Sequence, residues 1–540
     1  MSSTTQPSAL KKGLPKKTES VCPECGKIIE ANVYEKDGKV FMDKDCPEHG
    51  QFSDIYWSNA QAYLRAEHFA YDGVGLRNPH DKSLAAGENV NFLVDGKKYN
   101  LLSCTALALI DLTNRCNMNC PICFANANQA GYVYEPSYDE VVAMMEALRA
   151  EEPIKCTAVQ FSGGEPTVHP RLADIIRKSK ELKFAQVQVA TNGIVFAKDY
   201  EKLKACKEAG LNTIYLSFDG VSDDVYLQAR DRKMFDIKLK VIENCRRLKA
   251  EIGHSPSIVL VPTLVRGVND HQVGAITKFA FDHSDVIRGI NFQPVAFTGR
   301  ITREEVSKGR ITLTDLVDRF GEQTGYTVPE DWYPVPVVAP ISNFASEFLS
   351  QNKVTFTAHP HCGLATYLFQ SEDGKVTPLP RFVDIKMFSD GLSSIAMKME
   401  DSKFRKIRAI GVLRLLNKCV DSSKMPPGMT KKKFIDAITS IMGSKSKKTL
   451  ANFSWKMMYV GAMHFQDSFN YDVSRVERCA IHYITPDLKV IPFCAYNGGP
   501  EYRAEVEARF SIPLAEWKQR NKEEAKALEE ALVVPEDQRA

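Results

Sequence analysis

The chain has 540 residues, of which 44% are hydrophobic and 25% are charged. Its 70 Lys and Arg residues against 67 Asp and Glu give a formal net charge of +3, which provides no general electrostatic basis for nucleic-acid binding. No run approaches the ~18 uninterrupted apolar residues of a membrane-spanning helix, and the polar N-terminus lacks the apolar core of a signal peptide. We therefore expect a cytoplasmic protein of several domains, with peripheral contact to a membrane left open.

The first 57 residues divide into a polar stretch and a small cysteine-rich segment. Residues 1–20 are polar and are expected to form a disordered tail. Residues 21–57 contain a CxxC pair and a CxxH pair, joined by short alternating strands. This pattern predicts a rubredoxin-like or zinc-ribbon-like module that binds one iron or zinc ion. The expected ligands are Cys22, Cys25, Cys46 and His49.

Strand-like and helix-like patterns alternate from residue 104 to residue 305, after a connector over residues 58–103. Such alternation is typical of parallel strands with helices packed outside them. Six apolar runs predict an α/β fold, a partial (β/α)6 TIM-like barrel, with its chemistry at the C-terminal ends of the strands. The expected strands cover residues 106–112, 158–164, 185–193, 213–220, 257–265 and 289–297.

The most informative motif, CxxxCxxC, directly follows the first expected strand and contains Cys116, Cys120 and Cys123. Three thiolates on one short loop can hold three corners of a [4Fe–4S] cubane and leave the fourth iron open to a cofactor. A structural zinc site needs four closed ligands, usually as two CxxC pairs, so this spacing fits zinc poorly.

Two motifs together resemble the radical S-adenosylmethionine (SAM) superfamily. Phe124 follows the third cysteine, and the glycine-rich Gly163, Gly164 and Glu165 end the second expected strand. The resemblance implies a [4Fe–4S] cluster on the three cysteines, SAM as cofactor, and a reducing partner such as ferredoxin or flavodoxin. It also implies that the glycine-rich residues bind the methionyl amine of SAM, with Glu165 pairing the cation.

Further SAM contacts are implied at the ends of later strands. The candidates are Asn192, Ser217 and Arg230, of which Arg230 is expected to pair with the SAM carboxylate. A strand-end turn or a surface ion pair would account for each of them nearly as well.

Residues 306–540 predict a C-terminal α+β domain, and they carry a second set of cysteines, Cys362, Cys479 and Cys494. From the residues alone, three separate buried thiols would be almost as good an account. The segments HPHCGLATY, PLPRFVDI and RVERCAIHYITPD resemble the archaeal tetraether lipid synthases and equally their relatives among pterin methyltransferases. That resemblance implies an auxiliary [4Fe–4S] cluster on these cysteines. One departure is that the segment before the first barrel strand contains only Cys104, where relatives carry several cysteines.

The resemblance leaves several functions open. The leading hypothesis is an enzyme that generates a 5′-deoxyadenosyl radical and forms C–C bonds between isoprenoid lipid chains. The second is C-methylation of a pterin during methanopterin synthesis. A non-catalytic iron–sulfur electron-transfer protein is a third reading, disfavoured because both SAM motifs are intact. Modification of a peptide is a further option.

Overall fold

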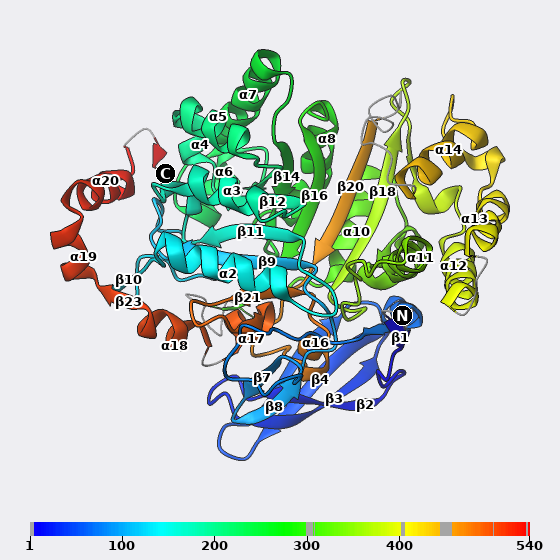
Figure 1. Ribbon diagram of the computed structural model, residues 1–540, viewed down its shortest axis with the longest axis horizontal. Helices are drawn as coiled ribbons and strands as arrows, with labels where there is room; N and C mark the ends of the chain where they lie inside the picture. Colours follow the sequence, from blue (N-terminus) through cyan, green and yellow to red (C-terminus); the bar gives the residue numbers. More distant parts are fainter. Residues whose placement is uncertain are drawn as a thin grey trace.

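The computed structural model shows one large sheet with helices around it and a small N-terminal sheet beside it (Figure 1). The structure describes residues 5–298, 306, 308–400, 405–442, 456–499, 502–535 and 538–539.

Six of the strands in the large sheet are the six that the apolar runs predict, and they lie side by side in parallel in chain order. They are β9 (Leu107–Thr113), β11 (Ala158–Gly163), β12 (Gln186–Thr191), β13 (Thr213–Ser217), β14 (Ser257–Val261) and β16 (Ile287–Pro294). The helices between them are α2 (Tyr138–Ala150), α3 (Leu172–Glu181), α4 (Ile194–Lys198), α5 (Tyr200–Ala209), α6 (Asp223–Arg230), α7 (Phe235–Ile252) and α8 (Val273–Asp282). This order brings the C-terminal ends of all six strands to one edge of the sheet.

Strands from the C-terminal region extend the sheet at both of its edges. β20 (Lys456–Met463) pairs in parallel with β16, and β21 (Ile481–Ile484) pairs in parallel with β9. The sheet then continues in antiparallel fashion through β18 (Gly363–Gln370) on one side and β22 (Val490–Pro492) on the other. The sheet therefore crosses the domain boundary expected between residues 305 and 306. Closure into a partial barrel stays a prediction, because the strand order among the described residues runs open from β17 (Tyr333–Pro334) to β22.

The N-terminal sheet has the strand order β2-β3-β4-β5 and is antiparallel throughout. Its strands are β2 (Lys16–Val21), β3 (Ile28–Lys36), β4 (Lys39–Cys46) and β5 (Gly50–Trp57). The disordered tail expected over residues 1–20 is corrected in part, since residues 16–20 belong to β2 and residues 5–7 form β1. The polar side chains of β2 bond to a distant segment: Ser20 donates to the Tyr471 carbonyl, and Thr18 donates to Asp472 at 2.7 Å.

Shorter elements surround these two sheets. The strands among them are β1 (Thr5–Pro7), β6 (Tyr71–Gly73), β7 (Asn91–Val94), β8 (Lys97–Asn100), β10 (Tyr132–Tyr134), β15 (Thr263–Leu264), β19 (Val376–Pro378) and β23 (Ser511–Pro513). The helices are α1 (Ala60–Ala66), α10 (Leu313–Thr324), α11 (Ala339–Leu349), α12 (Ile385–Glu400), α13 (Arg405–Cys419), α14 (Lys431–Met442), α16 (Val473–Glu477), α17 (Phe493–Gly498), α18 (Tyr502–Arg509), α19 (Leu514–Arg520) and α20 (Lys522–Leu532). Among the described residues, none of these helices is both long and apolar enough to cross a membrane.

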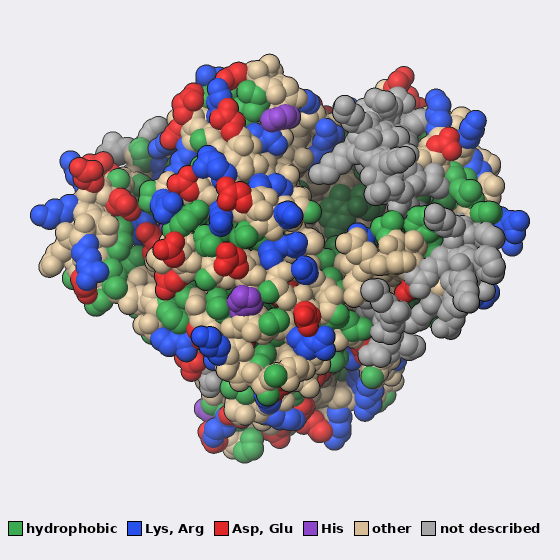
Figure 2. Space-filling view, in the orientation of Figure 1, with side chains coloured by type: hydrophobic (Ala, Val, Ile, Leu, Met, Phe, Trp, Pro, Cys, Tyr) green, Lys and Arg blue, Asp and Glu red, His purple; other side chains and the backbone are tan. Residues whose placement is uncertain are grey.

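A single hydrophobic core joins the N-terminal sheet to the large sheet. It contains Val33 and Trp57 of the N-terminal sheet, Phe161 and Val189 of the central strands, and Val460 of β20. Loss of order in the N-terminal module would therefore expose part of the core that supports the large sheet. On the face shown in Figure 2, Lys and Arg side chains are interspersed with Asp and Glu, and they form no single basic patch over the described surface there.

Candidate functional site

The loop after β9 places the three motif cysteines beside a cavity of about 470 Å³. Cys116, Cys120 and Cys123 all belong to the cavity lining. The loop is fixed by Asn128, whose Oδ1 accepts from the Cys116 amide at 2.9 Å and whose Nδ2 donates to the Cys116 and Met118 carbonyls. The spacing of the cysteines gave no indication of this Asn128 contact.

The chemistry of these three thiols fits an iron–sulfur cluster. Burial raises the pKa of Cys116 well above its usual value, and the neighbouring charges of Cys120, Glu165 and Cys123 add to the rise. Three thiolates are therefore stable here only next to a strongly positive group such as an iron cluster.

The two motif glycines are required by packing against the start of the cysteine loop. Gly163 has φ +129°, and a Cβ there would lie 2.1 Å from the Thr113 carbonyl oxygen. A Cβ on Gly164 would lie 2.4 Å from the Arg115 carbonyl oxygen. The Gly164 and Glu165 amides donate to these same two carbonyls, at 2.7 and 2.9 Å. Only glycine allows the end of β11 to approach the loop this closely.

Glu165 is 1% exposed and is held by donors of the protein itself. Its carboxylate accepts from the Thr167 amide at 3.1 Å, from Thr191 Oγ1 at 2.7 Å and from the Asn192 amide at 2.8 Å. Burial raises the pKa of this carboxyl group. The structure thus shows Glu165 ordering the end of β12, in addition to lining the cavity.

Arg230 is bonded differently from the expectation. Its guanidinium binds Asp219 through two hydrogen bonds, at 2.7 and 2.9 Å, and donates to the Ile122 carbonyl at 2.9 Å. The carboxylate partner of Arg230 in the structure is therefore Asp219. The hydrogen bond from Arg230 to the Ile122 carbonyl helps to hold the cysteine loop in position. Asn192 also braces this loop, because its Nδ2 donates to Asn117 Oδ1 at 2.7 Å, whereas Ser217 only lines the cavity.

Lys238 is a cation at the cavity that sequence reasoning missed. Its side chain comes from α7, is 1% exposed and donates from Nζ to the Asn192 carbonyl at 2.6 Å. Burial lowers the pKa of Lys238 to about 8. The signal was available, because Lys238 precedes Val241 and Ile242 by three and four positions and so shares their buried helix face.

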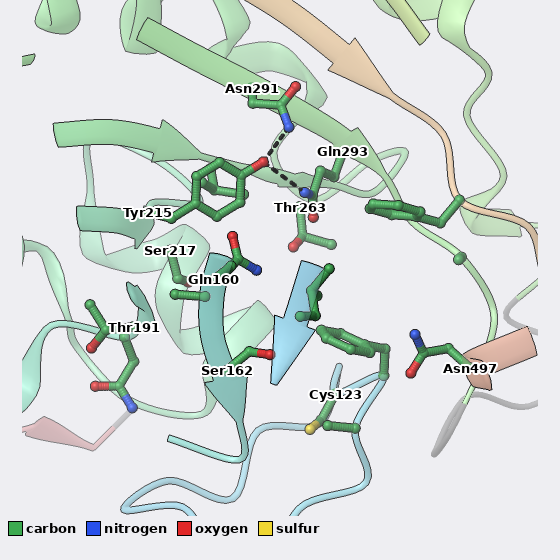
Figure 3. Close-up of a pocket in the computed structure, with 18 of the residues that line it drawn as sticks. Cys123, Gln160, Ser162, Thr191, Tyr215, Ser217, Thr263, Asn291, Gln293 and Asn497 are labelled. Atoms are coloured by element: carbon green, nitrogen blue, oxygen red, sulfur yellow. Dashed lines mark hydrogen bonds between the residues drawn. The ribbon is translucent and has the colours of Figure 1, made fainter. Parts of the chain in front are cut away.

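Polar side chains from the strands line the deeper part of the cavity, away from Cys123 (Figure 3). Gln188 Nε2 donates to Gln160 Oε1 at 2.6 Å, and the side-chain amides of Asn291 and Gln293 both donate to the Tyr215 hydroxyl. These residues were also missed. The sequence did contain an indication of them. Buried parallel strands are usually apolar throughout, and here amide side chains recur at every second position.

Aromatic side chains cover the side of the cavity nearest the C-terminal region. Phe465 and Phe493 stack with ring centroids 3.9 Å apart, and Tyr483 lies 5.5 Å from Phe493. Phe124, an expected cofactor contact, belongs to this wall with its ring centroid 6.2 Å from that of Phe493, and it is 46% exposed.

The four predicted ligands of the N-terminal module are brought together. The ligand atoms of Cys22, Cys25, Cys46 and His49 all lie within 4.8 Å of one another. His49 Nδ1 lies 3.8 Å from the Cys22 sulfur and 3.6 Å from the Cys46 sulfur. This spacing fits tetrahedral coordination of one metal ion.

The three C-terminal cysteines also lie close enough to interact electrostatically. Burial raises the pKa of Cys479, and the charges of Cys494 and Cys362 add to the rise. Arg475 lies beside them and is only 2% exposed. Its Nε has no hydrogen-bond partner, its Nη2 donates to the His464 carbonyl at 2.7 Å, and no salt bridge joins it to a carboxylate among the described residues. A buried cation without a carboxylate fits a site that carries negative charge on its sulfur ligands.

Comparison with known proteins gives two family matches and relatives that include one spanning almost the whole chain. Residues 110–280 match the radical SAM superfamily, and residues 14–58 match the HMPTM N-terminal zinc ribbon domain. A 7,8-dihydro-6-hydroxymethylpterin dimethyltransferase of Methanocaldococcus jannaschii is 46% identical over 519 residues, which cover 94% of this chain and 98% of the relative.

More distant relatives share only part of the chain. A GTP 3′,8-cyclase of Limosilactobacillus fermentum is 28% identical over 246 residues, or 44% of this chain and 67% of the relative. Among solved structures, HydG, a maturase of the [FeFe]-hydrogenase, has a TM-score of 0.34 at 13% identity and covers 64% of this chain and 84% of its own. SuiB of Streptococcus suis has a TM-score of 0.31 at 18% identity, covering 41% and 44%.

Proposed function

We propose that this chain, which belongs to the radical SAM family that includes the 7,8-dihydro-6-hydroxymethylpterin dimethyltransferase, is a C-methyltransferase that acts on a reduced pterin. The relative supports the second of the two activities considered from the sequence, pterin methylation, more than the joining of lipid chains. The comparisons do not support the resemblance to tetraether lipid synthases. They also do not support peripheral contact with a membrane, which was considered together with a lipid substrate.

The chain is a radical SAM enzyme, and its loop residues have defined tasks in that role. A [4Fe–4S] cluster with SAM, when bound, supplies a 5′-deoxyadenosyl radical that removes hydrogen from an unactivated carbon. Cys116, Cys120 and Cys123 would hold the cluster, and Arg230 keeps their loop in place through the Ile122 carbonyl. Lys238 offers an ammonium group to the carboxylate of SAM, a role first assigned to Arg230.

The observation that carries the proposal is a group of hydrogen-bonding side chains in the otherwise largely apolar lining of the cavity next to the cysteine loop. Its volume of about 470 Å³ lies within the ~300–1,000 Å³ of small-molecule sites. Apolar side chains such as Leu109 and Val259 make up much of the lining, and uncharged amides and a hydroxyl lie among them, on Gln160, Gln188, Tyr215, Asn291 and Gln293. An alkyl chain placed there would leave these groups unpaired, at a cost of about 1–3 kcal/mol each, whereas a polar heterocycle can satisfy them.

The other two cysteine sites take supporting roles in this proposal. Cys362, Cys479 and Cys494 hold an auxiliary [4Fe–4S] cluster, with Arg475 balancing its negative charge. The N-terminal module holds one structural zinc ion, as its match to a zinc ribbon supports. A ferredoxin or flavodoxin supplies the electrons.

The proposal is tested by the rate of SAM cleavage with and without substrate. The reconstituted enzyme is incubated without oxygen with SAM and a chemical reductant, and 5′-deoxyadenosine is quantified with no addition, with 7,8-dihydro-6-hydroxymethylpterin, or with a diether phospholipid. We expect the pterin, and not the phospholipid, to accelerate the formation of 5′-deoxyadenosine. Acceleration by the phospholipid alone would restore the lipid reading, and acceleration by neither would reject both.

A further inference from the structure

The deeper part of the cavity holds five polar side chains that the radical SAM chemistry does not use. They come from four parallel strands: Gln160 from β11, Gln188 from β12, Tyr215 from β13, and Asn291 and Gln293 from β16. We call this set the amide cradle. Gln160 and Tyr215 each precede by two positions a serine near the end of the same strand, so these two side chains lie one layer further from the cysteine loop than the serines do.

The cradle is only partly bonded to itself, and what it leaves free faces the cavity. The bonds within the cradle use Gln160 Oε1 and one N–H each of Gln188, Asn291 and Gln293. The carbonyl oxygens of Gln188, Asn291 and Gln293 and the amide nitrogen of Gln160 have no protein partner among the described residues. None of these atoms is among the fully buried ones that lack partners. They are therefore accessible from the cavity, which presents both donors and acceptors there.

Charge is absent from the cradle and concentrated at the opposite end of the cavity. The charged side chains in the described lining are Glu165, Arg230 and Lys238, and all three lie at the ends of strands or on helices beside the cysteine loop. Burial raises the pKa of Tyr215, so its hydroxyl stays protonated and neutral. The cavity thus has an ionic end, which suits SAM, and a neutral hydrogen-bonding end, which suits a neutral heterocycle.

The geometry points to the amide cradle as the subsite for the pyrimidinone edge of the pterin ring. That edge carries an amino group and a ring N–H as donors beside a carbonyl oxygen and a ring nitrogen as acceptors. The free carbonyls of Gln188, Asn291 and Gln293 accept from the donors, and the Gln160 amide donates to an acceptor. The pyrazine half of the ring, at the other end of the molecule, then faces the cysteine loop.

This inference rests on the proposed function, and it adds a prediction about selectivity. A site that hydrogen-bonds a polar group rejects an analogue that lacks the group, because the buried partners are left unpaired. The wild-type enzyme should therefore bind the pterin more tightly than the corresponding lumazine, in which a carbonyl oxygen replaces the 2-amino group. The exchange puts an acceptor where the cradle carbonyls need a donor.

The test measures ligand binding to the reconstituted enzyme with SAM present and oxygen excluded. Titration with 7,8-dihydro-6-hydroxymethylpterin should give a Kd about 10-fold higher or more in Gln188→Leu and Asn291→Leu, by the loss of one to two hydrogen bonds. The matched control is Gln186→Leu. Gln186 is a glutamine of the same strand that bonds Thr213 and lies outside the cavity lining, so its Kd should match wild type.

The outcomes separate the subsite from the proposed function. If the wild type binds the pterin, yet the two cradle variants keep its Kd or the lumazine binds equally well, the cradle assignment is overturned and the methyltransferase proposal stands. If the wild type does not bind the pterin at all, both are overturned. The lumazine comparison uses only the wild-type protein, so it decides the question even if a variant fails to fold.

Discussion

The N-terminal metal site and the cysteine loop after β9 use the same ligand chemistry for opposite purposes. In the first, four ligand atoms lie within 4.8 Å of one another, so one metal ion there would have four protein ligands and no open position. In the second, three thiols line a cavity of about 470 Å³ and leave one side open. Two features distinguish a site that stabilises a fold from one that receives a cofactor. They are the number of protein ligands and whether a cavity lies beside them.

The open site should be the one on which turnover depends. Cys116→Ala, Cys120→Ala and Cys123→Ala are each expected to reduce SAM cleavage to background, because the cluster loses one of its three ligands. The readouts are 5′-deoxyadenosine by chromatography and the far-ultraviolet circular dichroism of the fold. Cys206→Ala, which alters a buried thiol on α5, should retain cleavage. Cleavage that persists in all three loop variants would contradict the assignment.

The closed site should instead govern stability. Cys25→Ser or removal of zinc by a chelator is expected to lower Tm by several degrees, because structural zinc contributes folding free energy and the module shares the main core. Zinc content and thermal unfolding are measured together. SAM cleavage per intact cluster at low temperature should remain close to wild type. A loss of cleavage as complete as in the loop variants would remove the distinction between the two sites.

The C-terminal cysteines sharpen the comparison as a third case. Cys362→Ala and Cys494→Ala are expected to lower the iron content by about four atoms per chain while SAM cleavage stays measurable. Arg475→Met, with the ligands intact, should retain iron but shift the reduction potential of this cluster downward, because a buried positive charge is lost. An unchanged iron content in the cysteine variants would reject the auxiliary cluster.

Lys238 gives the smallest expected effect and one that depends on pH. Its pKa of about 8 means that the ammonium form is present below that pH and is lost above it. The affinity of the wild type for SAM should therefore fall as pH rises through about 8. Lys238→Met should weaken SAM binding by roughly 10-fold at pH 7 and show no such pH dependence. Equilibrium binding between pH 7 and pH 9 checks both points, and an unaltered profile in the variant would exclude the role.

Local spacing predicted the four residues that come together in the N-terminal module and the central strands, because both are encoded within a few residues. Long-range pairing was not predictable in this way. The residues of β21 pair with β9 across some 370 positions, for example Ile481 with Leu107, and β2 is held by Tyr471 and Asp472. A polar strand read alone therefore looked like a tail.

The cradle and Lys238 were missed for a related reason. Gln160 and Gln188 become neighbours only when β11 and β12 align in register, at which point their side chains point into one cavity. The pairing of Arg230 with SAM stays a prediction, and the sequence did not show that Asp219, eleven positions earlier, supplies a carboxylate to the same guanidinium. Folding pairs some charged side chains with each other, and only the folded structure shows which of them remain available to bind a ligand.

The most direct test of the account is the identity of the product formed from the pterin. The reconstituted enzyme, SAM, a reductant and 7,8-dihydro-6-hydroxymethylpterin are incubated without oxygen together with one-carbon donors, and the pterin fraction is analysed by mass spectrometry. The account predicts a pterin that carries one or two added methyl groups, formed together with 5′-deoxyadenosine. An unmodified pterin in the presence of sustained SAM cleavage would contradict it.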